Sequence, residues 1–351
     1  MTINQTKLEE FVGKMLQDLG AAVNSSLVLI GDQLGLYGAI ASHGAVDSTK
    51  LAELANISER YAREWLAAQA ASGYIEYDAE TEQFQMNPAQ IAVFVDEDSP
   101  TYMMGAFYSL SSVFSSQPKL VEAFRSGEGI SWGSHSECLF CGTAKFFRPT
   151  YKTYLTSEWL PSLEDAIAKL EKGSKVADVG CGHGCSTTIM AEAFPNSEFY
   201  GFDFHEPSIV AAQKQAREQG IENVTFEVAT AKNYPGNNYD LVAFFDCLHD
   251  MGDPVGAIAH VKETLKPDGT LMLVEPFAHD RLADNLNTFG RVMYGFSTTV
   301  CTPSSLNQEV GLALGAQAGE KRLREVVTSG GFSQFRRANQ TPFNLILEAR
   351  I

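Results

Sequence analysis

The chain has 351 residues, of which 44% are hydrophobic and 20% charged, as in an ordinary globular protein. One core rarely grows to this length, so we expect two domains. The net charge of −17 opposes binding to polyanions and argues against nucleic acids and anionic membranes as partners.

The N-terminal residues 1–7 lack the basic and then apolar pattern of a signal peptide. No segment approaches the roughly 20 uninterrupted apolar residues of a membrane span. We therefore expect a cytoplasmic protein, in which the six cysteines are reduced.

Residues 1–95 follow the pattern of a winged helix-turn-helix domain. Helical periodicity over 8–42 precedes two short predicted helices, the second with Ser58 as its N-cap, and two strands around a polar turn over 73–86. DNA binding is one interpretation of this pattern. However, residues 47–82 contain three basic and eight acidic residues, the opposite of what a DNA-binding surface needs.

Residues 96–160 form a predicted helical connector that is rich in aromatic side chains, including Trp132, Phe140 and Tyr151. Such side chains could stack on a flat substrate or pack between helices. The sequence leaves both roles open.

A predicted buried strand over 176–179 leads into the glycine-rich turn Gly180-Cys181-Gly182-His183-Gly184 and then into a predicted helix. Glycines let the backbone turn tightly and approach a ligand closely. Strand, turn and helix N-terminus together form the nucleotide-binding corner of a doubly wound α/β sheet. Asp178, just before the turn, suits a cationic ligand better than a pyrophosphate.

Further predicted strands also end at acidic residues. Asp203 follows the next strand, 19 residues after Gly184, a distance at which an acid can bind ribose hydroxyls. Asp246 and Glu275 end two later strands. Because ligands of open α/β sheets bind at the carboxyl ends of the strands, we expect the four acids to converge there.

The segment from Asp178 to Gly184 resembles motif I of class I S-adenosylmethionine (SAM)-dependent methyltransferases. The resemblance implies a seven-stranded, Rossmann-like SAM-binding domain over residues 161–351, behind an N-terminal all-α, winged-helix domain. It implies that SAM is the cofactor, with Asp203 on the ribose and Phe204 beside the adenine. The residues expected to bind SAM are Asp178, Gly180, Cys181, Gly182, Asp203, Phe204, Thr230, Ala231 and Asp246.

After the fourth strand of this domain, the segment Leu248-His249-Asp250-Met251-Gly252-Asp253 resembles a motif of small-molecule O-methyltransferases in which the histidine is the general base. Here Met251 replaces a tryptophan. Histidine can accept a proton near neutral pH, so His249 is the candidate catalytic residue, although it could instead only shape the pocket. The insertion over 277–329 is expected to line the acceptor pocket, with Tyr294, Phe296 and Cys301 as candidates.

Cys138 and Cys141 form an isolated Cys-x-x-Cys pair. A structural zinc site usually needs four ligands, and no second pair is visible, so we expect no metal. The predicted function is SAM-dependent methylation of a small, aromatic or hydroxylated metabolite, with O-methylation favoured. The alternatives are a SAM-sensing winged-helix transcriptional regulator and a thiol or arsenite methyltransferase. The resemblance also implies a homodimer formed through the winged-helix domain.

Overall fold

The computed structural model describes residues 3–351, which form two compact units. The first contains the chain through Ser111 together with Cys141–Pro149, and the second contains Ser112–Phe140 and Thr150–Ile351. The segment predicted as a connector over 96–160 is thus divided between the two units.

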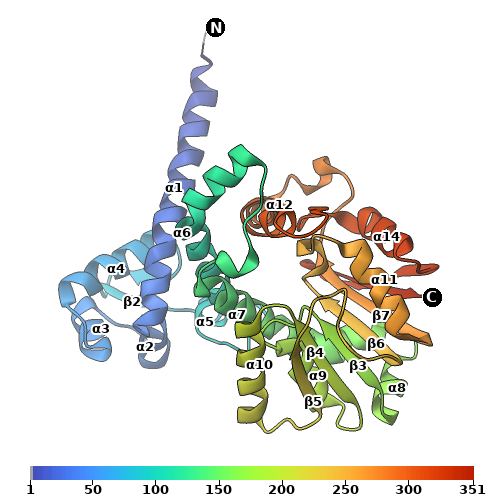
Figure 1. Cartoon of the computed structure of the whole chain (residues 1–351). Coiled ribbons are helices and arrows are strands. Elements are labelled where there is room, and N and C mark those ends of the chain that lie inside the picture. The colour runs from blue at the N-terminus through green and yellow to red at the C-terminus, as the bar shows by residue number, and fades with distance from the viewer. Residues whose placement is uncertain (1–2) are drawn as a thin grey trace. The chain divides into compact units, whose positions relative to one another are not determined.

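The first unit contains the predicted winged helix (Figure 1, blue). Its core gathers around Tyr37, Trp65 and Leu66, and its small sheet is extended by a bridge between Val46 and Phe84. Ser58 stands at the predicted N-cap, but its hydroxyl forms no capping hydrogen bond. The elements are α1 (Gln5–Gln33), α2 (Leu36–His43), α3 (Ser48–Ala55), α4 (Glu59–Ala71), β1 (Glu76–Asp78), β2 (Gln83–Gln85) and α5 (Pro88–Phe94).

Helices follow this domain and lead into the second unit. Their bounds are α6 (Met104–Ser126), η1 (Trp132–Ser134), α7 (Glu137–Tyr154), η2 (Leu155–Trp159), η3 (Leu160–Ser162) and α8 (Ala166–Lys172). Trp159, on η2, is fully buried and packs edge-on against Tyr151 of α7. This contact fixes the end of α7 within the second unit.

A seven-stranded sheet forms the centre of the second unit, in the order β5-β4-β3-β6-β7-β9-β8. Neighbours from β5 to β7 are parallel, and β9 is antiparallel to both β7 and β8. The strands are β3 (Lys175–Val179), β4 (Glu198–Asp203), β5 (Val224–Val228), β6 (Tyr239–Phe245), β7 (Leu265–Pro276), β8 (Gln334–Gln340) and β9 (Asn344–Arg350).

Helices flank this sheet. Figure 1 shows α10 beside the half formed by β4 and β5, and α11 and α14 beside the half that contains β6 and β7. The helices are α9 (Cys185–Ala193), α10 (Glu206–Gln219), α11 (Pro254–Thr264) and α14 (Gly319–Ser329), and the insertion after β7 adds η5 (Leu282–Asn285), α12 (Thr288–Phe296), η6 (Ser297–Cys301) and α13 (Thr302–Leu306). A short η4 (Leu248–Asp250) follows β6.

The chain winds outward from β3 in both directions, because β3 pairs with β4 on one side and β6 on the other. This reversal is a topological switch point, where open α/β sheets bind their ligands. The predicted doubly wound fold with a winged-helix N-terminus is confirmed. Within residues 3–351 no single helix is long and apolar enough to cross a membrane, and only the bent pair α1–α2 meets the length and composition test.

Candidate functional site

The glycine-rich turn lies at the switch point, between β3 and α9. Gly180, Gly182 and Gly184 have φ of 78°, 53° and 75°, in the left-handed region that favours glycine. A Cβ at Gly180 would lie 2.6 Å from the Sγ of Cys247. The backbone N–H groups of Gly180 and Cys181 both donate to the carbonyl of Phe202, at 2.7 and 3.1 Å, so the turn is held against β4.

Asp178 is the fully buried acid at the start of this turn. Its Oδ2 accepts hydrogen bonds from Ser186 Oγ at 2.6 Å and Thr187 Oγ1 at 2.7 Å, both in the first turn of α9. Its Oδ1 is buried and has no hydrogen-bond partner among the described residues. Burial raises the pKa of Asp178 to about 6, although the two hydroxyls lower it.

Asp203 ends β4 beside the same turn. Its two oxygens accept from the backbone N–H groups of Gly182 at 2.9 Å and His205 at 2.8 Å, and burial raises its pKa. The next residue, Phe204, is 51% exposed, which leaves its ring free to contact a ligand. Thr230 lies after β5, where its hydroxyl donates to Asn233 Oδ1 at 2.8 Å.

Asp246 follows β6 in the left-handed region, with φ of 51°. Tyr151 donates its hydroxyl proton to Oδ2 at 2.9 Å, and Asn344 donates from Nδ2 to Oδ1 at 3.1 Å. Burial and the nearby Glu275 raise the pKa of Asp246 to about 8. The aromatic pattern included Tyr151 without this role, and nothing in the sequence pointed to Asn344.

His249 is 4% exposed and lies between two carboxylates. Its Nδ1 is 2.6 Å from Glu275 Oε2, and its Nε2 is 3.2 Å from Asp250 Oδ1. The other oxygen of Glu275 accepts from the backbone N–H of Leu248 at 3.0 Å, which fixes the carboxylate. Burial lowers the pKa of His249, but Asp250 and Glu275 outweigh that effect and raise it well above its usual value.

The insertion after β7 packs onto the loop that carries His249. Ser305 Oγ donates to the carbonyl of Met251 at 2.7 Å, and the backbone N–H of Gly252 donates to Gln308 Oε1 at 3.0 Å. Cys301, from the same insertion, lies beside His249, and burial raises the pKa of its thiol to about 12. The other two expected pocket residues, Tyr294 and Phe296, are half-buried on α12.

An aromatic row lies near the end of β4. The ring of Phe140 is 4.5 Å from that of His205 and 5.6 Å from that of Trp132, measured between ring centroids. His205 stands directly after Phe204 and two residues after Asp203. The stretch over 132–140 therefore lies close to the expected adenosine end of the site.

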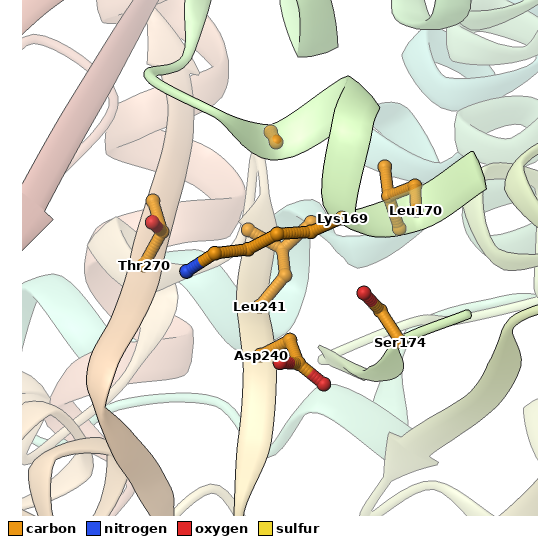
Figure 2. A pocket seen from close by; sticks show the side chains of 7 residues that line it. Lys169, Leu170, Ser174, Asp240, Leu241 and Thr270 are labelled. Carbon is orange, nitrogen blue, oxygen red and sulfur yellow. The ribbon is translucent and has the colours of Figure 1, made fainter. Parts of the chain in front are cut away.

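A small pocket lies at the opposite edge of the sheet, where β3, β6 and β7 approach their amino-terminal ends. Figure 2 shows Lys169 and Leu170 of α8 above Ser174, Asp240 and Leu241, with Thr270 to one side. Its volume of about 10 Å³ holds one water molecule at most and is too small for a metabolite. The acidic residues at the carboxyl edge remain the candidate site.

The domains match known families. Residues 170–328 match the family model described as a methyltransferase domain, and residues 22–96 match the Rv2258c-like winged HTH domain. A segment is 30% identical over 131 residues to a ubiquinone biosynthesis O-methyltransferase of Leptothrix cholodnii, covering 36% of this chain and 53% of that protein. The chain spans half or less of the demethylmenaquinone methyltransferases that it also matches.

Solved structures resemble the whole chain. A putative O-methyltransferase from Nostoc punctiforme has a TM-score of 0.72 and 21% identity, covering 96% of this chain and 98% of that one. Human N-acetylserotonin methyltransferase in complex with SAM has a TM-score of 0.69 and 16% identity, covering 97% of each chain. At such identities the likeness establishes the fold alone.

The fold and the acidic switch point thus define a protein with the architecture of class I SAM-dependent methyltransferases that carry an N-terminal winged helix. More specifically, the methyltransferase-domain model covers residues 170–328 and the Rv2258c-like winged HTH model covers residues 22–96.

Proposed function

We propose that this protein is a SAM-dependent methyltransferase that methylates a hydroxyl group of a small molecule. The observation that carries the proposal is a set of four acids at the carboxyl ends of neighbouring strands in a methyltransferase domain, of which Asp178, Asp203 and Glu275 are buried and Asp246 is half-buried. The names of the similar proteins, a ubiquinone biosynthesis O-methyltransferase and N-acetylserotonin methyltransferase, support a small-molecule acceptor.

The residues of the site fit SAM. The buried Oδ1 of Asp178 has no hydrogen-bond partner among the described residues, and a Cβ at Gly182 would meet nothing within 4 Å, so the turn has uncrowded backbone near a carboxylate oxygen that lacks a donor. SAM supplies a methyl group on a sulfonium that a nucleophile can displace. The proposed binding residues are Asp178, Gly180, Cys181, Gly182, Asp203, Phe204, Thr230, Ala231 and Asp246.

His249 is the proposed general base. With its Nδ1–H donated to Glu275, a neutral imidazole presents Nε2 as the proton acceptor, and Glu275 stabilises the imidazolium that forms. The two carboxylates favour the protonated ring, so the competent neutral form grows as the pH rises through the raised pKa.

Transfer of a labelled methyl group from SAM to a panel of phenols and other hydroxylated compounds tests the activity. Labelled product supports the proposal. A protein that binds SAM, turns over none of the panel and shifts its own operator DNA in a salt-dependent manner would instead be a regulator.

The affinity for SAM should depend on pH through Asp178. Its pKa of about 6 means that the carboxylate is charged at neutral pH and is neutralised as the pH falls below that value. We expect calorimetry from about pH 8 to about pH 5 to show affinity falling with acidification, by up to about tenfold for each pH unit below the pKa. Asp178→Asn should bind more weakly and flatten this dependence. An identical slope in both proteins would exclude Asp178 as the source.

We also propose that the protein is a homodimer that associates through α1. This helix exposes a continuous apolar stripe beside a groove of about 370 Å³ between α1 and α4, and such a surface usually marks an interface. The exposed side chains are Leu8, Phe11, Val12, Met15, Leu16, Leu19 and Val23. A cytoplasmic location stays a prediction from the sequence.

Light scattering at micromolar concentration should give twice the chain mass of 38.3 kDa. The double variant Phe11→Asp/Leu16→Asp should shift the population to monomer, because two buried charges at an interface cost several kcal/mol. Gln17→Asp, on the exposed opposite face of α1, is the matched control and should stay dimeric. A monomeric wild type would refute the proposal.

A further inference from the structure

Three metal-ligating side chains meet beside the proposed base, although they come from segments about fifty residues apart. His249 and Asp250 stand on η4 after β6, and Cys301 ends η6 in the insertion after β7. One ligand atom from each lies within 4.8 Å of the other two. His249 and Cys301 are buried and Asp250 is half-buried, which distinguishes this group from an exposed acidic cluster.

The distances between these ligand atoms suit an ion with tetrahedral coordination. Zinc bonds of roughly 2.0–2.3 Å to nitrogen, oxygen and sulfur place neighbouring ligand atoms about 3.3–3.6 Å apart. The distance from His249 Nε2 to Asp250 Oδ1 is 3.2 Å, close to this value. The same Oδ1 is buried and forms no hydrogen bond with the described residues, although it faces His249 Nε2 within the cluster.

The surroundings of His249 also match those of a metal ligand. A histidine that binds a metal through one nitrogen almost always donates the other N–H to a carboxylate or carbonyl group. Here Nδ1 lies 2.6 Å from Glu275 Oε2, and Glu275 is itself held by the backbone N–H of Leu248. The ring is thus oriented with Nε2 toward Asp250 and Cys301.

We propose that His249 Nε2, an oxygen of Asp250 and the sulfur of Cys301 bind a Zn²⁺ ion, with Glu275 orienting the imidazole. Three protein ligands leave a fourth position for water or for an oxygen or sulfur of a small molecule. Binding displaces the thiol proton of Cys301 and any proton on Nε2 to solvent, because the ligands are thiolate and neutral imidazole.

A bound Zn²⁺ would occupy the lone pair on Nε2 that His249 needs to accept a proton, so Zn²⁺ should inhibit methyl transfer. That consequence rests on the proposed function, whereas metal binding does not. The sequence suggested no metal site, because its only Cys-x-x-Cys motif is formed by Cys138 and Cys141. Cys301 lies outside that motif, about fifty residues from His249 and Asp250.

Cobalt replaces zinc as the spectroscopic probe. Titration of the chelator-treated full chain with Co²⁺ should give one equivalent of binding, with a thiolate-to-cobalt charge-transfer band and the intense visible bands of a tetrahedral site, both removed by added Zn²⁺. Cys301→Ser should abolish the charge-transfer band. Asp250→Asn should weaken binding by about tenfold or more, and Glu275→Gln by about 10–100-fold.

The matched control is Cys138→Ser/Cys141→Ser, which removes two exposed thiols and should leave the titration unchanged. Far-UV circular dichroism of each variant confirms folding, and the Asp250→Asn titration provides a second test if Cys301→Ser fails to fold. The proposal is overturned if the wild type shows no thiolate band, if the band survives in Cys301→Ser, or if it disappears in the control. None of these readouts requires methyl transfer.

Discussion

Replacing His249 with alanine should lower the turnover number by about 10²–10⁴-fold, the usual contribution of a positioned general base. The Nε2 of His249 is the proposed proton acceptor for the hydroxyl, and Glu275 at 2.6 Å from Nδ1 holds the ring in place. Affinity for SAM should change little. The residual rate would come from alignment of the two reactants alone.

The pH dependence of turnover distinguishes a His249 that acts as a general base from a His249 that only lines the pocket. Asp250 and Glu275 raise the pKa of His249, so wild-type turnover should increase as the pH rises through that pKa. The alanine variant should lose this increase of turnover with pH. Its rate should rise only at a pH high enough for the acceptor hydroxyl to ionise without a base. His43→Ala, on an exposed residue of the winged-helix unit, is the control. Near-full activity of His249→Ala at neutral pH would leave His249 as a wall of the pocket.

Asp178→Ala and Asp203→Ala should each weaken SAM binding by about 1.5–3 kcal/mol, or one to two decades in Kd, which is typical for a lost hydrogen bond to a charged group. Asp178 contributes a buried oxygen with no partner among the described residues, and Asp203 contributes a carboxylate fixed by two backbone N–H groups. Calorimetry measures both affinities directly.

The control for these variants is Asp268→Ala, which removes an exposed acid paired with Lys169 and should not alter SAM affinity. Thermal unfolding should accompany each measurement, because Asp178→Ala also strands the hydroxyls of Ser186 and Thr187. Asp178→Asn keeps an oxygen that can accept from these two hydroxyls, so it tests the effect of the negative charge alone. Unchanged affinity in both alanine variants would refute the assignment.

The sequence predicted the fold well because its signals are local. Apolar runs that end in Asp178, Asp203 and Asp246 mark strands, and the glycine-rich turn marks the corner of a doubly wound sheet. The two wing strands were predicted within residues 73–86, and the ladder covers Glu76–Asp78 and Gln83–Gln85. The difference is confined to element ends.

The site could be predicted only where its residues follow a strand directly. Tyr151 and Asn344 reach Asp246 from positions about a hundred residues away on either side, and neither carries a local motif. Cys301 was predicted only as a candidate lining residue of the acceptor pocket, because its insertion has no regular periodicity from which a contact with His249 could be inferred. Ser186 and Thr187 had a detectable signal, since hydroxyl side chains at the start of a helix can turn back to the acid that precedes the loop.

The order of strands in the sheet has a consequence for synthesis of the protein. β9 lies between β7 and β8, and Asn344 at its start donates a hydrogen bond to the carboxylate of Asp246. The ribosome delivers β8 before the strand that joins β8 to the sheet. A nascent chain that has exposed everything through β8 therefore has an open sheet edge at β7, and its Asp246 lacks the hydrogen bond from Asn344.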